Sequence, residues 1–352
     1  MASLSYHERV DVALWAGDPE LALDVVEAAY DASHGGAPSV WEGFTRHLVR
    51  QPAGDRSRLL AAMPARHDKA PPGSGWRSAL LYLAVLLGHD LPDDILVTER
   101  QAALTSIEND WFYPAATRFH VLAKAELDAG RPVSDRLVAV FRRSAECHHH
   151  REVRRLVAGV REPVLNVGEA WAEAALADAA SPGAPWGPLL AHIVTAKAAR
   201  PSATWERKAQ RLIAEIGAEP LQERVVAWLS LVGLPRTVPV RRDRPGAPAS
   251  DLFDPYNANA LRGLVWLLCL IEPRLDTVKA LGSLAHTGLR ATSGQGARTP
   301  KVVNAAVHAL ARLSHPAARQ ELDRLAKVTS AHGAHKLIAA ALAGASAGAT
   351  GA

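Results

Sequence analysis

One segment near the C-terminal end combines the residue types that bind anions. It runs Ser293-Gly294-Gln295-Gly296-Ala297-Arg298-Thr299-Pro300-Lys301. The two glycines let backbone N–H groups approach a ligand, and Thr299 is placed to cap a helix that begins at Pro300. Arg298 and Lys301 bring positive charge to that helix N-terminus, where anions bind well. A flexible turn between two helices uses the same residues, because glycine ends helices and Thr-Pro begins them. The sequence leaves both readings open.

A second segment, Cys147-His148-His149-His150, contains the residue types that bind transition metals. Consecutive residues on a helix point about 100° apart, so the three histidines cannot converge on one ion. We therefore expect no metal site and no cofactor. The segment is interpreted as a solvated, basic helix end, with these arginines nearby: Arg142, Arg143, Arg151, Arg154 and Arg155.

The chain has nine tryptophans, and aromatic rings of this kind either fill a core or contact a partner. Trp205 and Trp228 fall on the apolar stripes of predicted helices, so we expect them in the core. Trp111, Phe112 and Tyr113 lie in a break between helices beside Pro114. These three rings are therefore the candidates for contact with a partner.

Positive charge is concentrated at the C-terminal end. Residues 273–352 contain ten Lys or Arg and three Asp or Glu, whereas the whole chain has a net charge of only +4. A basic face on a helical protein attracts phosphates, with an affinity that falls as salt rises. The candidate contacts for an anion or a nucleic acid are Arg290, Gly294, Gly296, Arg298, Thr299, Lys301 and Arg312, together with Arg241, Arg242 and Arg244.

Helical periodicity dominates the elements that must position these residues. Within 205–216 the apolar residues recur at i, i+4, i+7, i+8 and i+11, and 221–232 repeats the pattern after a break with Gly217 and Pro220. Two such helices joined by a short turn pack antiparallel. About sixteen helical segments are expected, with no strand pattern. The predicted fold is all-α, a HEAT-like α-solenoid of stacked antiparallel helix pairs.

Proline marks the predicted boundary between domains. Five prolines between Leu234 and Asn257 exclude a helix there. We therefore predict an N-terminal helical-repeat array over 1–233 and a Pro/Arg-rich linker over 234–257. Basic HEAT-like helices follow over 258–342, and the small residues of 343–352 form a disordered tail.

Composition limits the class of protein. In 352 residues, 48% are hydrophobic, which excludes a disordered chain. Two cysteines cannot build a disulfide framework, which favours a reducing, cytoplasmic location. The first residues lack the apolar core of a signal peptide. The longest apolar stretch, Gly263 to Ile271, is shorter than the roughly 20 residues that span a bilayer, so no membrane partner is expected.

Three stretches carry a family resemblance: LLAHIVTAKAARPSATWERKAQRLI from Leu189, NALRGLVWLLCLI from Asn259 and SGQGARTPKVVNAAVHALARL from Ser293. In this order they resemble the helical N-terminal region of large bacterial MolR-like proteins, over about residues 189–342. The resemblance implies a HEAT-like scaffold and carries no catalytic residue across. Members of that family have a further C-terminal domain of unknown function, which we expect to be absent here.

Three classes of function are consistent with these patterns. Repeated helical hairpins and the lack of a catalytic motif favour a non-enzymatic scaffold that binds a protein or peptide partner. The alternative is a protein that binds nucleic acid or another polyanion through its basic C-terminal face. A HEAT-like DNA glycosylase is the third hypothesis, although the sequence contains no motif of those enzymes.

Overall fold

The computed structural model describes residues 4–34, 38–114, 117–148, 150–241, 253–292, 296–297, 299–329 and 332–349. Its helices make the fold all-α, as predicted, and two-residue strands β1 (Ala291–Thr292) and β2 (Gly296–Ala297) pair antiparallel. None of the helices in these ranges combines the length and the apolar character that crossing a bilayer requires.

The chain divides into two compact units, and each is described separately. Unit 1 comprises residues 1–108 and 113–133, and unit 2 comprises 109–112 and 134–352. This division does not fall at the Pro/Arg-rich segment that was predicted as a linker, and both described ends of that segment pack within unit 2. Thr237 donates its backbone N–H to the Gly168 carbonyl, and Asp254 is fully buried.

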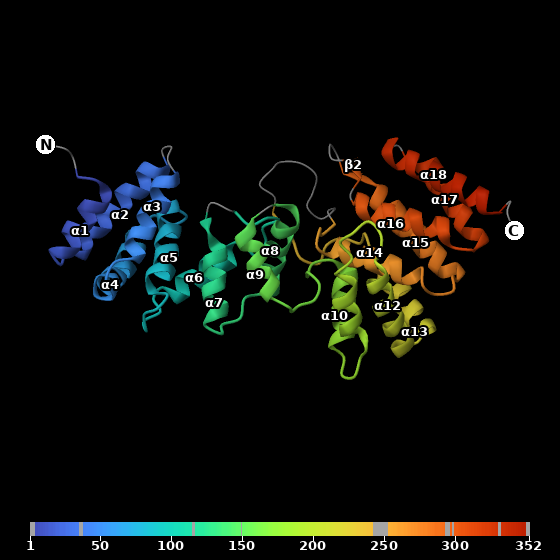
Figure 1. The fold of residues 1–352 in the computed structure, drawn as a ribbon, viewed down its shortest axis with the longest axis horizontal. Helices are drawn as coiled ribbons and strands as arrows, with labels where there is room; N and C mark the ends of the chain where they lie inside the picture. The colour runs from blue at the N-terminus through green and yellow to red at the C-terminus, as the bar shows by residue number, and fades with distance from the viewer. Residues whose placement is uncertain are drawn as a thin grey trace. The chain divides into compact units, whose positions relative to one another are not determined.

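Unit 1 contains seven helices among its described residues (Figure 1). They are α1 (Tyr6–Trp15), α2 (Pro19–His34), α3 (Pro38–Val49), α4 (Ala53–Lys69), α5 (Gly75–Gly88), α6 (Val97–Ser106) and α7 (Phe119–Asp128). Each of α1–α6 packs on the next helix or the next but one within this unit. Helix α2 has a capped start, since Asp18 accepts a hydrogen bond from the Leu21 N–H, and Pro19 is the first helical residue.

A buried ion-pair network ties α6 to α7 in unit 1. The Arg100 guanidinium donates to the Glu126 carboxylate at 3.0 Å, with both side chains almost fully buried. Arg131 and Gln101 donate to the same carboxylate. Burial opposes ionisation of Glu126, but the hydrogen bonds from Arg131, Gln101 and Arg100 outweigh it and hold the Glu126 pKa below its ordinary value.

Replacing Glu126 by glutamine is expected to lower the free energy of unfolding of unit 1 by about 1.5 kcal/mol at neutral pH. A carboxylate whose pKa is lowered on folding stabilises the native state above its unfolded pKa, and this contribution is lost as the pH falls through the folded value. The difference between wild type and Glu126→Gln should therefore shrink below about pH 4.5. Urea unfolding of both proteins at several pH values measures this difference in stability. A difference that stays constant down to about pH 2 would contradict the lowered pKa of Glu126.

Unit 2 contains eleven helices among its described residues. They are α8 (Asp135–Cys147), α9 (Arg151–Gly159), α10 (Ala170–Ala180), α11 (Trp186–Ile193), α12 (Ala203–Ile216), α13 (Ala218–Ser230), α14 (Asn257–Leu268), α15 (Leu275–Leu289), α16 (Pro300–Arg312), α17 (Pro316–Val328) and α18 (His332–Ala349). Residues 343–349, predicted as a disordered tail, therefore continue α18. Residues 350–352 lie outside the described part of the chain.

The core of unit 2 follows the predicted stripes. Trp205, Ala209 and Leu212 of α12 are buried, as are Leu221 and Trp228 of α13. These two helices pack together, and α13 also contacts α10 and α15. One continuous apolar cluster extends from Leu165 through these helices to Ile338 of α18. Helices α11 and α14 are therefore held by a shared core.

Candidate functional site

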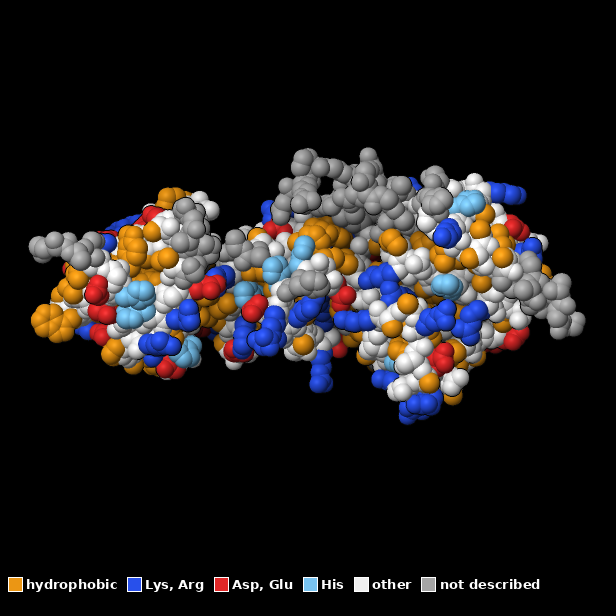
Figure 2. Space-filling model, turned by 45° about the horizontal axis from the view of Figure 1, so that its top comes forward, with side chains coloured by type: hydrophobic (Ala, Val, Ile, Leu, Met, Phe, Trp, Pro, Cys, Tyr) orange, Lys and Arg blue, Asp and Glu red, His pale blue; other side chains and the backbone are white. Residues whose placement is uncertain are grey.

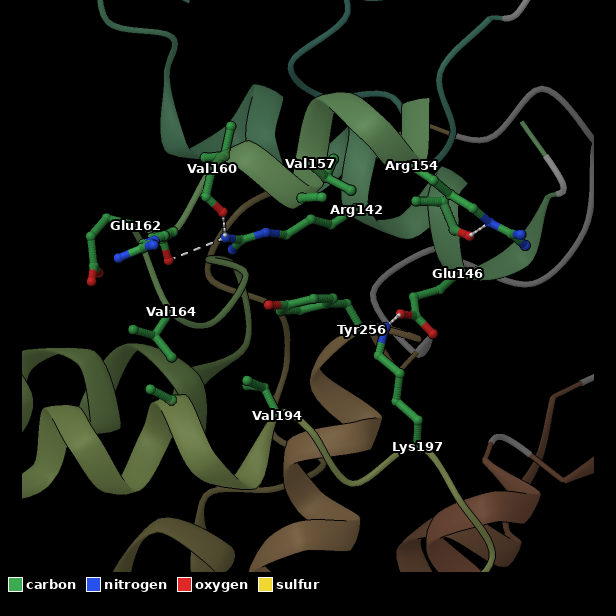
Figure 3. A pocket seen from close by; sticks show the side chains of 14 residues that line it. Arg142, Glu146, Arg154, Val157, Val160, Glu162, Val164, Val194, Lys197 and Tyr256 are labelled. Atoms are coloured by element: carbon green, nitrogen blue, oxygen red, sulfur yellow. Dashed lines mark hydrogen bonds and ion pairs between the residues drawn. The ribbon is translucent and has the colours of Figure 1, made fainter. Parts of the chain in front are cut away.

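A pocket in unit 2 lies between α8, α9, α11 and the residue before α14 (Figure 3). It has a volume of about 550 Å³, within the range of ligand-binding cavities. The ring of Tyr256 lies in the middle of the view, with Arg142 and Val157 on one side and Val164 and Val194 on the other. The pocket therefore has an apolar lining around an aromatic centre.

Arg142 of α8 forms the rigid base of the pocket. Its guanidinium donates to the carbonyl oxygens of Pro163, Val160 and Arg161 and lies 4.7 Å from the centre of the Tyr256 ring. The side chain is buried, and this burial lowers the Arg142 pKa. Because the cation is shared among three carbonyls and one ring, it holds the 160–163 loop and Tyr256 in place.

Tyr256 contributes the aromatic surface. Burial raises the pKa of its hydroxyl above 10.0, so the phenol is protonated at neutral pH. A neutral ring offers an apolar face and, at its hydroxyl, a hydrogen-bonding group. It can therefore contact both an aliphatic side chain and a polar group of a ligand.

The rim is more exposed and carries two further cations, Lys197 and Arg154. Lys197 pairs with Glu146 at 2.9 Å, and Arg154 donates to the Ala145 carbonyl. The charged residues of the lining are four cations and two acids: Arg142, Arg154, Arg161, Lys197, Glu146 and Glu162. On the face drawn in Figure 2, Lys and Arg side chains also outnumber Asp and Glu over the unit 2 helices. The pocket therefore favours a ligand with negative charge.

Beneath the pocket, buried polar side chains join α8 to the start of α14. Arg143 donates to Asp254 at 3.1 Å and also to the backbone carbonyls of Trp111 and Asp110. The other oxygen of Asp254 accepts hydrogen bonds from Asn166 and from the N–H of Tyr256. This network fixes the backbone of Tyr256, whose ring lines the pocket.

Glu169 closes the same network from the start of α10. Its carboxylate accepts hydrogen bonds from the Asp254 N–H, the Asn257 amide and the Trp171 indole. Burial and the neighbouring Asp254 raise the Glu169 pKa. Because all of these groups are buried and hydrogen-bonded, their role is to hold the helices rather than to meet a ligand.

The interpretation of Arg142 and Arg143 as a solvated helix end is wrong. Each residue is only 2% exposed, because backbone carbonyls and a carboxylate from distant segments surround their guanidinium groups. His148 does lie at the surface, 4.6 Å from the Phe112 ring, and His149 is outside the described residues. No group of potential metal ligands occurs in the described ranges.

The aromatic candidates separate into core and surface residues. Trp111 is 7% exposed and packs under Arg143 and Arg236, and Tyr113 is 5% exposed and hydrogen-bonds His120. Their burial corrects the expectation that these two rings meet a partner directly. Phe112 is half-buried and remains accessible.

The structure does not bring the predicted anion-binding residues together as one described site. Gly294, Arg298, Arg242 and Arg244 lie outside the described residues, and Gly296 is in β2. Arg290 and Arg312 are exposed. Three others are engaged within the protein: Arg241 pairs with Asp110, Thr299 is 4% exposed, and Lys301 donates to the Pro255 carbonyl and the Asn259 side chain.

The predicted helix start at Pro300 is confirmed, with Thr299 as the N-cap residue, but the Thr299 side chain makes no capping hydrogen bond. Burial lowers the Lys301 pKa. The ammonium group therefore serves the junction between α14 and α16 rather than a ligand.

Sequence reasoning missed Tyr256 and Lys197 as pocket residues. Tyr256 falls in the segment interpreted as a linker, although Asp254-Pro255 is itself a helix-start signal. Lys197 lies in a turn after α11 and has no local signal, because its role depends on Glu146, 51 residues earlier.

Comparisons of the chain with known protein families, with characterised proteins and with solved structures give no match. The resemblance to MolR-like helical regions therefore stays a prediction. The function proposed below rests on the geometry of the pocket around Tyr256.

Proposed function

We propose that this chain is a non-enzymatic helical-repeat scaffold whose unit 2 binds a segment of a partner protein in the pocket between α8, α9, α11 and Tyr256. The observation that carries the proposal is the pairing of an apolar lining with a cationic rim on one rigid base. A peptide with an aliphatic side chain beside an aspartate or glutamate complements both features.

The helix contacts support the scaffold part of the proposal. In unit 2, α15 packs on α13, α16 and α17, and α16 packs on α14, α15, α17 and α18. Contacts with the next helix and the next but one are typical of stacked helical hairpins such as HEAT repeats. The resemblance to MolR-like helical regions points to the same architecture.

Selection of peptides on the intact protein tests the proposal. Random peptides of about a dozen residues, displayed on phage, are selected on the wild-type chain, and the enriched peptides are synthesised for titration. The expected peptides carry an acidic residue next to an aliphatic one. The double variant Arg154→Glu/Lys197→Glu should weaken their binding about tenfold or more, because like charges then face each other across the contact.

The matched control is Arg207→Glu/Arg211→Glu, which makes the same change in net charge on exposed positions of α12. This variant should bind the peptides as the wild type does. Peptides that bind both double variants equally would place the binding site elsewhere. A chain that selects no peptide but binds duplex DNA with a steep loss in salt would favour the nucleic-acid alternative.

A further inference from the structure

A second pocket in unit 2 lies between α14, α16 and the segment that leads into α12. It has a volume of about 400 Å³. Trp266 and Cys269 line it from the end of α14, and His308 and Arg312 from α16, while Arg200 lies on the third wall. None of these residues belongs to the pocket around Tyr256.

Small side chains explain why this pocket exists. Ala305 and Ala309 stand at i and i+4 on α16, so they share the face that looks toward α14. Larger aliphatic residues at these positions would fill the space. The wall opposite is rigid, because Trp266 packs edge-on against Trp205 with ring centres 5.1 Å apart.

The third wall is held in place by α14. Arg262 donates to the carbonyl oxygens of Ala196, Lys197 and Ala198, just before Arg200 in the chain. These hydrogen bonds fix the backbone that carries Arg200 to the pocket. The pocket is therefore formed before any ligand arrives, which lowers the entropy cost of binding.

Two cations of the pocket have no partner among the described residues. Arg200 and Arg312 are exposed and make no hydrogen bond or ion pair within the described ranges. In contrast, Arg142, Arg143, Arg262 and Lys301 all donate to carbonyls or side chains of the protein. Glu206 is the one acid in the lining, so the charge of the pocket is positive.

We propose that this second pocket binds a small organic anion, with its carboxylate or phosphate at Arg200 and Arg312 and its apolar part against Trp266 and the alanines of α16. Guanidinium groups bind carboxylates and phosphates through paired hydrogen bonds. An indole ring and methyl groups favour an aromatic or aliphatic body. This ligand differs in class and place from the protein segment proposed for the pocket around Tyr256.

Calorimetric titration with four simple probes tests the proposal on the full chain. Phenyl phosphate and benzoate have both a charge and a ring, inorganic phosphate has only the charge, and benzyl alcohol has only the ring. Phenyl phosphate or benzoate should bind with one equivalent, more tightly than either single-feature probe. Arg200→Ala and Arg312→Ala should each weaken that binding about tenfold, which corresponds to one charge-assisted hydrogen bond.

Two further variants separate pocket binding from general attraction to positive charge. Ala305→Leu keeps every charge but fills the cavity, so it should abolish binding. Arg290→Ala removes an exposed cation outside the pocket and should leave binding unchanged. Equal weakening by Arg290→Ala and Arg312→Ala, or binding that survives Ala305→Leu, would overturn the proposal.

Cys269 gives a readout at the site itself. The chain has two cysteines, so in a Cys147→Ser background Cys269 is the single thiol. Burial raises its pKa to about 11, and the alkylation rate can be followed in mildly alkaline buffer. Saturating phenyl phosphate should slow this alkylation severalfold, and Arg312→Ala should remove the protection.

If no probe binds at millimolar concentration and none protects Cys269, the proposal is wrong. Binding of duplex DNA instead would assign the two arginines to a phosphate backbone.

Discussion

Replacing Asp254 by alanine is expected to lower the free energy of unfolding of unit 2 by about 3–5 kcal/mol. Asp254 is fully buried and pairs with Arg143, which is also buried. Removing the carboxylate leaves a guanidinium without its counter-ion in a region that water does not reach. The hydrogen bonds from Asn166 and from the Tyr256 N–H lose their acceptor at the same time.

Hydrogen exchange measured by mass spectrometry separates the two units in this experiment, because peptides from unit 1 and unit 2 report independently. Asp254→Ala should speed exchange in α8 and α14 by two orders of magnitude or more, with α4 and α5 of unit 1 unchanged. Asp323→Ala is the control, since Asp323 is exposed on α17 and its loss should change stability by less than about 0.5 kcal/mol. Equal effects of the two substitutions would contradict the role assigned to the network.

The same variant links stability to the pocket around Tyr256. Asp254 holds the backbone N–H of Tyr256, and Arg142 holds its ring. Loss of the first contact leaves the ring with a less defined position. Peptides selected on the wild type should therefore bind Asp254→Ala more weakly even under conditions where unit 2 remains folded.

The sequence predicted the helices well because their signals are local. Apolar stripes predicted α12 and α13, and Thr299-Pro300 predicted the start of α16. Each of these signals depends on residues within one or two turns of each other. The all-α class follows from such signals alone.

Burial of charge was not predictable in the same way. Arg142 and Arg143 look like surface residues in sequence, yet the acceptors that bury them lie 18–21 residues away for Arg142 and up to 111 residues away for Arg143. The division into two units depends on distant contacts for the same reason. Prolines mark the end of a helix, but they do not show that Asp254 forms an ion pair with Arg143 of α8 within unit 2.

The pockets also depend on contacts between distant segments. In the sequence, Ala305 and Ala309 look like ordinary small residues of a helix. Only the packing of α16 against α14 shows that they leave a cavity. Arg312 was predicted as an anion contact from charge alone. The structure places Arg312 in the lining of the same pocket as Arg200, a residue that was not predicted as a contact.

The close approach of α11 and α14 leads to the second large prediction. Gly263 of α14 lies against Ile193, the last residue of α11. A Cβ atom at position 263 would lie 2.4 Å from the Ile193 carbonyl oxygen and 2.8 Å from its Cα atom. Both are backbone atoms, so the contact is relieved only if one helix moves. Gly263→Ala is therefore expected to lower the free energy of unfolding of unit 2 by about 3 kcal/mol, at the upper end for overpacking.

Gly187→Ala is the matched control in the partner helix. Gly187 lies in α11, and a Cβ atom there meets no other atom within 4 Å. The same substitution should raise stability by about 0.5 kcal/mol, because alanine loses less backbone entropy on folding than glycine does. Urea unfolding of the two variants therefore gives shifts of opposite sign from one chemical change. If Gly263→Ala were neutral or stabilising, α11 and α14 would have to pack farther apart than the structure shows, and the wall that carries Val194 and Lys197 would lose its fixed position against Tyr256.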